Sequence, residues 1–182
     1  MTLTNTHRHE PNFTGPERTP RLRLKPKEAS SGTVDGAWWP RSDDLSAELP
    51  DLLAVLSVRL GDIERVQYAL PEWKSVPRTI NTGAARVKLD GYQRQPHCTV
   101  GILGQGRQKL TLLVVPPYTD ASDAHTAMMK AAEPHGTGTA DELLGIGPRD
   151  RARRDGYTLA ENRWESEGGA PCRAPAMATS ST

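Results

Sequence analysis

The most unusual residues of this chain lie in one short run, Gly32–Ser42, where the tandem tryptophans Trp38 and Trp39 stand between Asp35 and Arg41. A carboxylate in a pocket can serve as a general base, and a guanidinium can hold an anionic group. Indole rings supply the apolar wall that most small-molecule sites have. These residue types predict a corner that binds a ligand or a partner.

Two further residues are expected to complete this corner, Trp73 from a long loop and Arg86 from a strand. A structural interpretation of the tandem tryptophans competes with the binding one. Successive strand residues face opposite sides, so one tryptophan should enter the core while the other covers the opposite face or an edge. Large aromatic side chains commonly fill such junctions, and pockets are few per protein. Both points favour the structural interpretation.

No other part of the chain carries a recognisable catalytic, metal or cofactor pattern. Ser42 and Cys98 lack the sequence surroundings of a nucleophile, and His97 should face the side of its strand opposite to Cys98. The five histidines show no metal-ligand spacing. The glycines of 101–106 are followed by a strand, where a dinucleotide-binding loop needs a helix. We therefore expect no metal and no cofactor.

Hydrophobic periodicity predicts an α+β fold: a two-layer sandwich with a mainly antiparallel sheet of about five or six strands and two helices on one face. Leu110–Val115 is apolar on both faces, which is typical of a central strand. The second helix is capped by Thr119 or Asp120 and runs to about Glu133. The expected strands are Arg21–Lys25, Thr33–Trp39, Ile63–Leu70, Ala85–Leu89, Cys98–Ile102 and Lys109–Val115.

The first helix is expected in two pieces. Ser42 is a good N-cap for a short helical turn over Asp43–Glu48, and Pro50 fits the first turn of a separate main helix. Leucines at helical spacing continue that helix as far as Gly61, the expected C-cap.

Composition limits the classes of function. The 182 residues carry 23 basic and 22 acidic side chains, a net charge of +1, so we do not expect nucleic acid as a partner. The longest apolar run, Leu110–Pro117, is far shorter than the ~20 residues of a membrane helix, and we expect a soluble, cytoplasmic protein. The expected organisation is a disordered leader over 1–19, an α+β domain over 20–134 and a largely disordered tail over 135–182.

Trp164 lies in that tail, in the run Trp164-Glu165-Ser166-Glu167-Gly168-Gly169. An exposed tryptophan would leave a large apolar surface in contact with water. We therefore expect Trp164 to dock on its own domain or on a partner.

The run Val34–Ser42, followed by Leu45 and Glu48-Leu49-Pro50, resembles an actinobacterial family catalogued only as a domain of unknown function. The resemblance extends over residues 21–133 and includes Trp73 and Val114-Val115-Pro116-Pro117. It implies no activity, cofactor or catalytic residue.

The sequence thus predicts a small non-enzymatic binding or regulatory domain that recognises a small anionic ligand or a protein partner through the corner from Asp35 to Arg41. The alternative is an enzyme without a local signature, in which Asp35 is the general base and Arg41 holds an anionic group.

Overall fold

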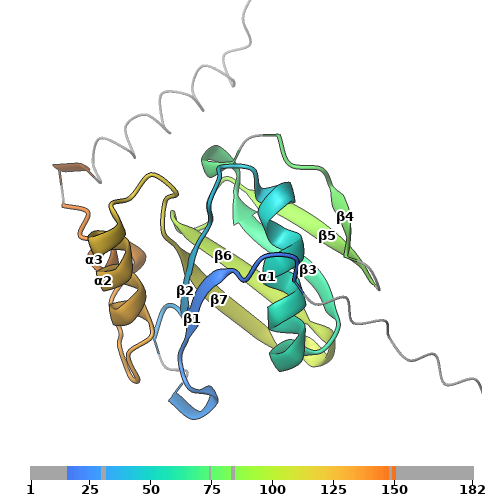
Figure 1. Cartoon of the computed structure of the whole chain (residues 1–182), viewed down its shortest axis with the longest axis horizontal. Helices are drawn as coiled ribbons and strands as arrows, with labels where there is room; N and C mark the ends of the chain where they lie inside the picture. Colours follow the sequence, from blue (N-terminus) through green and yellow to red (C-terminus); the bar gives the residue numbers. More distant parts are fainter. Residues whose placement is uncertain (1–15, 30–31, 74, 83–84, 148, 151–182) are drawn as a thin grey trace, which may run out of the picture. The chain divides into compact units, whose positions relative to one another are not determined.

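Seven strands form one mixed sheet in the order β1-β2-β7-β6-β3-β5-β4 (Figure 1). The structure is a computed structural model that describes residues 16–29, 32–73, 75–82, 85–147 and 149–150. The chain divides into two compact units, Met1–Ile146 and Gly147–Thr182, and the strands of the described residues lie in the first. The strands are β1 (Arg21–Leu24), β2 (Gly36–Trp39), β3 (Ile63–Ala69), β4 (Thr79–Thr82), β5 (Ala85–Tyr92), β6 (Thr99–Gly104) and β7 (Lys109–Val114).

Antiparallel pairing dominates the sheet, as the sequence predicts. Four of the six strand pairings are antiparallel, and only β2 with β7 and β3 with β5 are parallel. The α+β class is confirmed, and the six expected strands all form. The seventh strand, β4, lies in the stretch after Trp73 for which the sequence predicts only a long loop. Its sequence Thr-Ile-Asn-Thr has one apolar side chain, too few for an alternating pattern, and its pairing with β5 fixes it as an edge strand.

One continuous helix, α1 (Leu45–Leu60), covers one face of the sheet. Its N-cap is Asp44, whose carboxylate accepts hydrogen bonds from the N–H groups of Ser46 and Ala47, so the expected cap at Ser42 is wrong. The expected break at Pro50 is also wrong. Pro50 lies inside the helix and removes one backbone donor, while six leucines of α1 are buried against the sheet: Leu45, Leu49, Leu52, Leu53, Leu56 and Leu60. Gly61 is the C-cap, as expected.

The second main helix, α2 (Ala121–Ala131), lies on the opposite face, which corrects the expected placement of both helices on one face. Strand β7 gives the physical reason. Leu112 and Val114 enter the core under α1, whereas Leu113 and Val115 enter a second core with Ala124 and other residues of α2. A strand that is apolar on both faces needs a cover on each face.

The first unit continues to Ile146, beyond the expected domain boundary at residue 134. A short helix, α3 (Ala140–Leu143), follows α2, and Ala140, Leu143 and Leu144 pack against the second core. Lys25, only 1% exposed, donates from Nζ to the carbonyl oxygen of Gly136 at 2.7 Å. The segment after α2 is therefore held against the end of β1.

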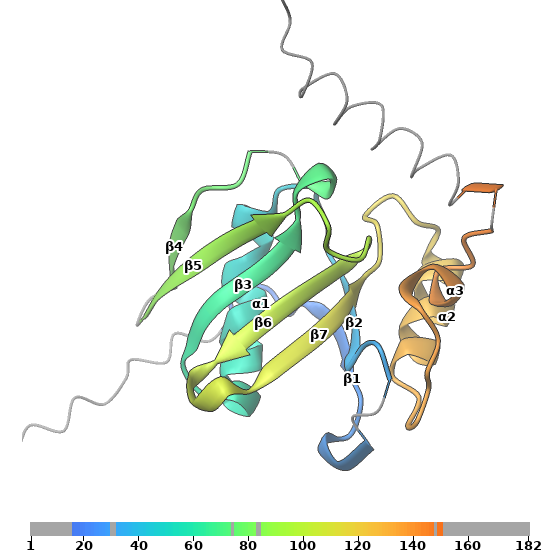
Figure 2. The same ribbon diagram turned by 180° about the vertical axis from the view of Figure 1, so that it is seen from behind.

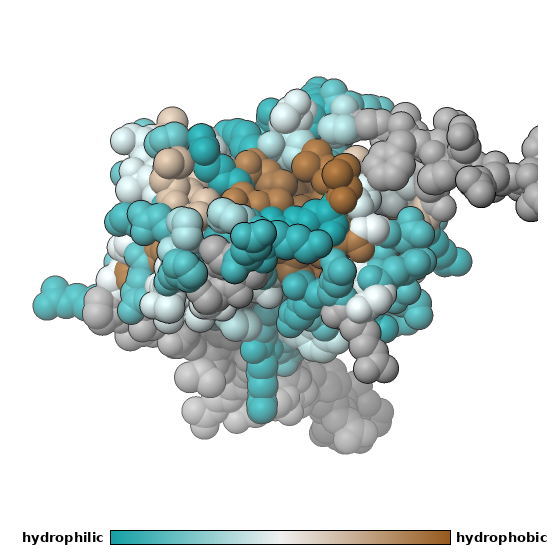
Figure 3. All heavy atoms as spheres, turned by 90° about the horizontal axis from the view of Figure 1, so that it is seen from below, coloured by the Kyte–Doolittle hydropathy of each residue, from teal (hydrophilic) through white to brown (hydrophobic). Residues whose placement is uncertain are grey.

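Seen from behind, α2 and α3 lie beside β1 and β2 (Figure 2). In this view no helix covers the side of the sheet formed by β3, β5 and β6. Within the described residues, α2 contacts β1 and β2 and leaves the outer side of these other strands without a helix. From below, a small apolar patch is surrounded by hydrophilic residues (Figure 3).

Candidate anion site at the end of β2

Trp38 and Trp39 have different environments because they point to opposite faces of β2. Trp38 is 1% exposed and belongs to the core under α1. Its ring stacks on that of Trp73 with the centroids 5.9 Å apart and the planes at 17°. The two rings fill space between sheet and helix, so Trp38 and Trp73 come together as core residues.

Trp39 packs against the second core and carries a cation on its ring. The guanidinium carbon of Arg21 lies 3.5 Å from the centroid of the Trp39 ring. Arg21 Nε donates to the carbonyl oxygen of Trp39 at 3.0 Å, and Nη2 donates to that of Pro40 at 2.6 Å. The antiparallel register of β1 and β2 pairs Arg21 with Trp39 and thereby causes this contact. Arg21 is thus fixed in one conformation.

Arg41 brings a second guanidinium close to the first. The pKa of Arg21 lies below its ordinary value, because burial disfavours the charged form and because Arg41 repels it, while Glu48 acts in the opposite direction. Arg41 is exposed and donates to the carbonyl oxygen of Thr19 at 3.3 Å. Ser42 donates its hydroxyl to Glu48 Oε1 at 2.9 Å. The end of β2 therefore holds two cations beside one carboxylate.

Asp35 lies at the other end of β2 and takes no part in this cluster. Its Oδ2 accepts a hydrogen bond from the N–H of Thr111 at 2.8 Å, and its own N–H donates to the carbonyl oxygen of Thr111 at 2.7 Å. Six residues of extended chain span roughly 20 Å, so the structure does not bring Asp35 and Arg41 together. Asp35 instead joins β2 to β7 at the start of their parallel pairing.

The remaining candidates also lie apart from Arg41. Arg86 is exposed on β5, where its Nη2 donates to Thr79 Oγ1 at 3.4 Å. Trp164 lies outside the described residues, so its expected docking stays a prediction.

The segment before β6 contains a contact that sequence spacing could not reveal. Glu72 Oε1 accepts the N–H of Cys98 at 2.5 Å and lies 3.3 Å from Nδ1 of His97. Cys98 precedes β6 and has a φ of 53°, so it is not the strand residue that the sequence predicts. The residue is buried in the second core. The carboxylate thus holds the turn that leads into β6.

Metal-binding clusters and membrane-spanning helices are both absent from the described residues. No group of three or more histidine, cysteine or acidic side chains there could hold a metal ion. No helix in that part of the chain is both long and apolar enough to cross a membrane.

The arrangement that can bind a ligand is therefore the pair Arg21 and Arg41 beside Trp39. Arg21 donates to carbonyl groups through Nε and Nη2. Its third nitrogen, Nη1, has no hydrogen-bond partner among the described residues. A guanidinium held by its backbone contacts can receive a carboxylate or phosphate with little loss of conformational entropy. Sequence reasoning missed Arg21, although the predicted β1–β2 hairpin contained the register that pairs it with Trp39.

Comparison with known proteins gives one match. No curated protein and no solved structure matches the chain. Residues 21–131 match the model of a family of unknown function, DUF5994. Because this segment is more than half of the 182 residues, the protein belongs to the DUF5994 family of unknown function.

Proposed function

We propose that this domain is a non-enzymatic binding or regulatory domain that takes up a small anionic ligand at the end of β2. The observation that carries the proposal is the fixed guanidinium of Arg21, stacked on Trp39 and close to Arg41. Two cations that repel each other gain stability when an anion lies between them. A carboxylate or phosphate group fits the planar donors of both side chains.

The position of Asp35 supports binding rather than catalysis. A general base must lie within hydrogen-bond reach of the proton that it removes. Asp35 binds the backbone of Thr111 at the other end of β2 and lies far from Arg41. An enzyme built on Asp35 and Arg41 has no support in this geometry.

The test is binding of inorganic phosphate and of citrate to the full chain, measured by calorimetry and by thermal unfolding at constant ionic strength. We compare the native chain with Arg41→Gln, because Arg41 is exposed and its removal leaves the core intact. Loss of a hydrogen bond between charged groups costs about 1.5–3 kcal/mol. We therefore expect Kd to rise by roughly ten- to a hundredfold.

Arg94→Gln is the matched control, since Arg94 is also exposed but lies in the turn after β5. It should leave Kd unchanged. Equal binding by the native chain and Arg41→Gln would show that anions bind elsewhere. Absence of binding by either probe would remove the proposed anion site.

A further inference from the structure

Positive charge is concentrated in the middle of the chain. Residues 65–109 contain eight lysines and arginines and only two acids, Glu72 and Asp90, a formal excess of six positive charges in a chain whose net charge is +1. This span covers nearly all of β3, then β4, β5 and β6 and the start of β7. The balanced total charge of the chain therefore hides a strongly basic region.

Strand register places cations of this region on the side of the sheet opposite α1. Leu103 pairs with Arg65 on one side and with Lys109 on the other, and Arg65 pairs with Lys88. Paired residues face the same side, so these cations form a row across β7, β6, β3 and β5. Three strand spacings give the row a length of about 14 Å. Together with Arg86 of β5, we call Arg65, Lys88 and Lys109 the basic face.

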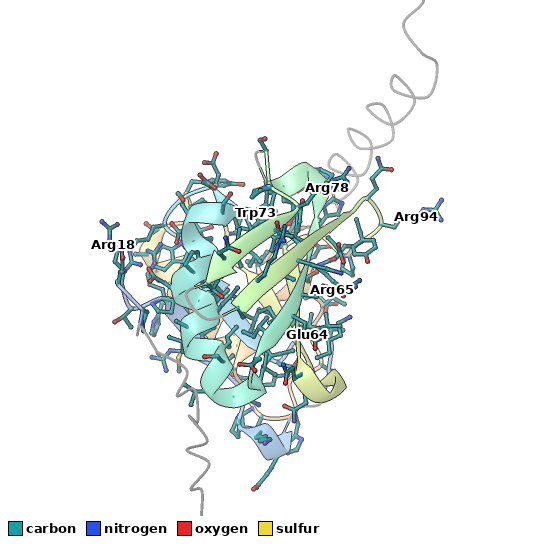
Figure 4. The ribbon with its side chains drawn as sticks, turned by 90° about the vertical axis from the view of Figure 1, so that its right-hand side faces the viewer. Arg18, Glu64, Arg65, Trp73, Arg78 and Arg94 are labelled. Carbon is teal, nitrogen blue, oxygen red and sulfur yellow. The ribbon has the colours of Figure 1, made fainter. Side chains whose placement is uncertain are left out.

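The basic face is open. Arg86, Lys88 and Lys109 are exposed, and the side chain of Arg65 is 42% exposed although it forms an ion pair of 2.8 Å with Asp90. No ion pair joins Lys88 or Lys109 to a carboxylate of the described residues. Arg65, Glu64 and Arg94 project from the side of the sheet away from α1 (Figure 4). Even with Glu64 and Asp90 included, the cations outnumber the acids.

Neutral groups lie among these cations. Tyr92 of β5 is 43% exposed and points to the same side as Asp90 and Lys88, which lie two and four residues before it. Gln67 and Thr111 share this side, on either side of Gly101, where a Cβ would lie 3.3 Å from Gln67 Oε1. The glycine leaves room for the glutamine side chain to lie flat across the sheet. The face thus combines cations, an aromatic ring and hydrogen-bonding side chains.

Acidic residues gather at the other end of the sheet. Residues 116–146, which contain α2 and α3, have five acids and a single lysine, Lys130. Helix α2 contacts β1 and β2, and β2 lies four strand spacings, about 19 Å, from β5. This distance exceeds the Debye length of about 8 Å at physiological salt. The acids of α2 therefore lie beyond the Debye length from the β5 end of the basic face, whereas Lys109 of β7 is one strand spacing from β2.

We infer that the basic face binds single-stranded nucleic acid. Phosphates would lie along the row Lys109, Arg65 and Lys88, and an unpaired base would stack on Tyr92. The major groove of duplex DNA admits a helix or a two-stranded ribbon, so a flat sheet face of several strands suits a single strand better. An acidic peptide would use the cations alone, whereas a single strand uses the cations, the ring and the amide. The inference is independent of the anion site at Arg21 and Arg41.

The test uses the full chain and a fluorescent oligothymidylate of about 12 nucleotides, within the range that small single-strand-binding folds cover. Affinity is measured by anisotropy at several salt concentrations. The double substitution Lys88→Gln and Lys109→Gln should weaken binding severalfold. It should also reduce the slope of log K against log salt concentration by about 1.4, because each phosphate contact on a single strand contributes roughly 0.7. Tyr92→Ala should weaken binding with no change of slope.

Lys130→Gln is the matched control, because it removes one exposed lysine from α2 and should change neither affinity nor slope. Arg41→Gln should bind the oligonucleotide like the native chain, which separates this surface from the anion site. Absence of binding at low salt, or equal salt slopes for the native and doubly substituted chains, would overturn the inference. Tighter binding of polyglutamate than of oligothymidylate would identify the face as a site for an acidic protein segment.

Discussion

At the scale of single residues, the two tandem tryptophans have different structural roles. Trp38 fills the core with Trp73, and Trp39 supports the guanidinium of Arg21 on the other face. This division follows from strand alternation and was predicted from the sequence. The role of Arg21 could not be predicted from composition or motif, because it depends on which residue of β1 faces Trp39.

Tyr68 gives a prediction for alkaline pH. Its pKa lies above the ordinary value, because burial disfavours the phenolate and because Asp90 repels it. The unfolded chain therefore ionises first, near pH 10. The contribution of Tyr68 to stability is complete below that pH and is lost as pH rises through the higher pKa of the folded state. We expect the urea midpoint to fall above about pH 10.

Tyr68→Phe should reduce this alkaline loss of stability, because phenylalanine has no proton to release. The control is Tyr92→Phe, which removes the same hydroxyl from an exposed tyrosine. An identical pH profile for the native chain and Tyr68→Phe would show that other groups cause the alkaline loss.

At the scale of elements, helix α1 shows how capping decides where a helix begins. Ser42 and Asp44 are both good N-cap residues, and their types do not distinguish them. The structure places the carboxylate of Asp44 on two backbone N–H groups and turns Ser42 towards Glu48. The helix begins at Leu45, directly after this cap, and continues through Pro50 as one piece.

This arrangement predicts unequal effects of two alanine substitutions. Asp44→Ala should lower the free energy of unfolding by about 0.5–2 kcal/mol, since it leaves the N–H groups of Ser46 and Ala47 without their acceptor. Ser42→Ala should cost less, because it removes a hydrogen bond to Glu48 and a long one of 3.4 Å from the N–H of Asp44, and neither satisfies an N–H group of α1. Urea titrations of both variants measure the difference. A larger loss of stability for Ser42→Ala would show that Ser42, and not Asp44, is the N-cap of α1.

The sequence predicted six of the seven strands and both main helices, because their apolar residues recur at regular intervals. It missed β4 because an edge strand buries little and Ile80 is its one apolar residue. It placed α2 on the wrong face because periodicity shows which side of a helix is buried and not which side of the sheet receives it. Of the candidate site, Trp39 and Arg41 stay together, whereas Asp35 and Arg86 lie apart from Arg41 because they belong to the far end of β2 and to β5.

At the scale of the whole molecule, the first compact unit is longer than the family match. The match ends at residue 131, yet Lys25 donates to Gly136 and the Thr33 hydroxyl donates to the carbonyl oxygen of Gly138 at 2.6 Å. These bonds tie the start of the sheet to the segment after α2. The first compact unit therefore extends past the family match to Ile146.

A chain that ends at Ile146 keeps all the strands and helices of the first unit and is the reference for this test. A chain that ends at Glu133 should lose at least about 1.5–3 kcal/mol, because the buried ammonium of Lys25 loses a hydrogen-bond acceptor. Circular dichroism in urea measures both midpoints. Equal stability of the two shortened chains would mean that the contact between Lys25 and Gly136 contributes nothing.

The parallel pairing of β2 with β7 also bears on how the chain acquires its structure during synthesis. Asp35 meets Thr111 across 76 residues of sequence. At a synthesis rate of about 5–20 residues per second, the ribosome needs roughly 4–15 s to make the second partner after the first. During this interval the hairpin of β1 and β2 has an unpaired inner edge, with Trp38 and Trp39 still lacking most of their partners. The first strands to leave the ribosome are therefore among the last to be paired and buried. Because its tryptophans stay exposed in this interval, the nascent hairpin is the segment that we most expect a chaperone to bind.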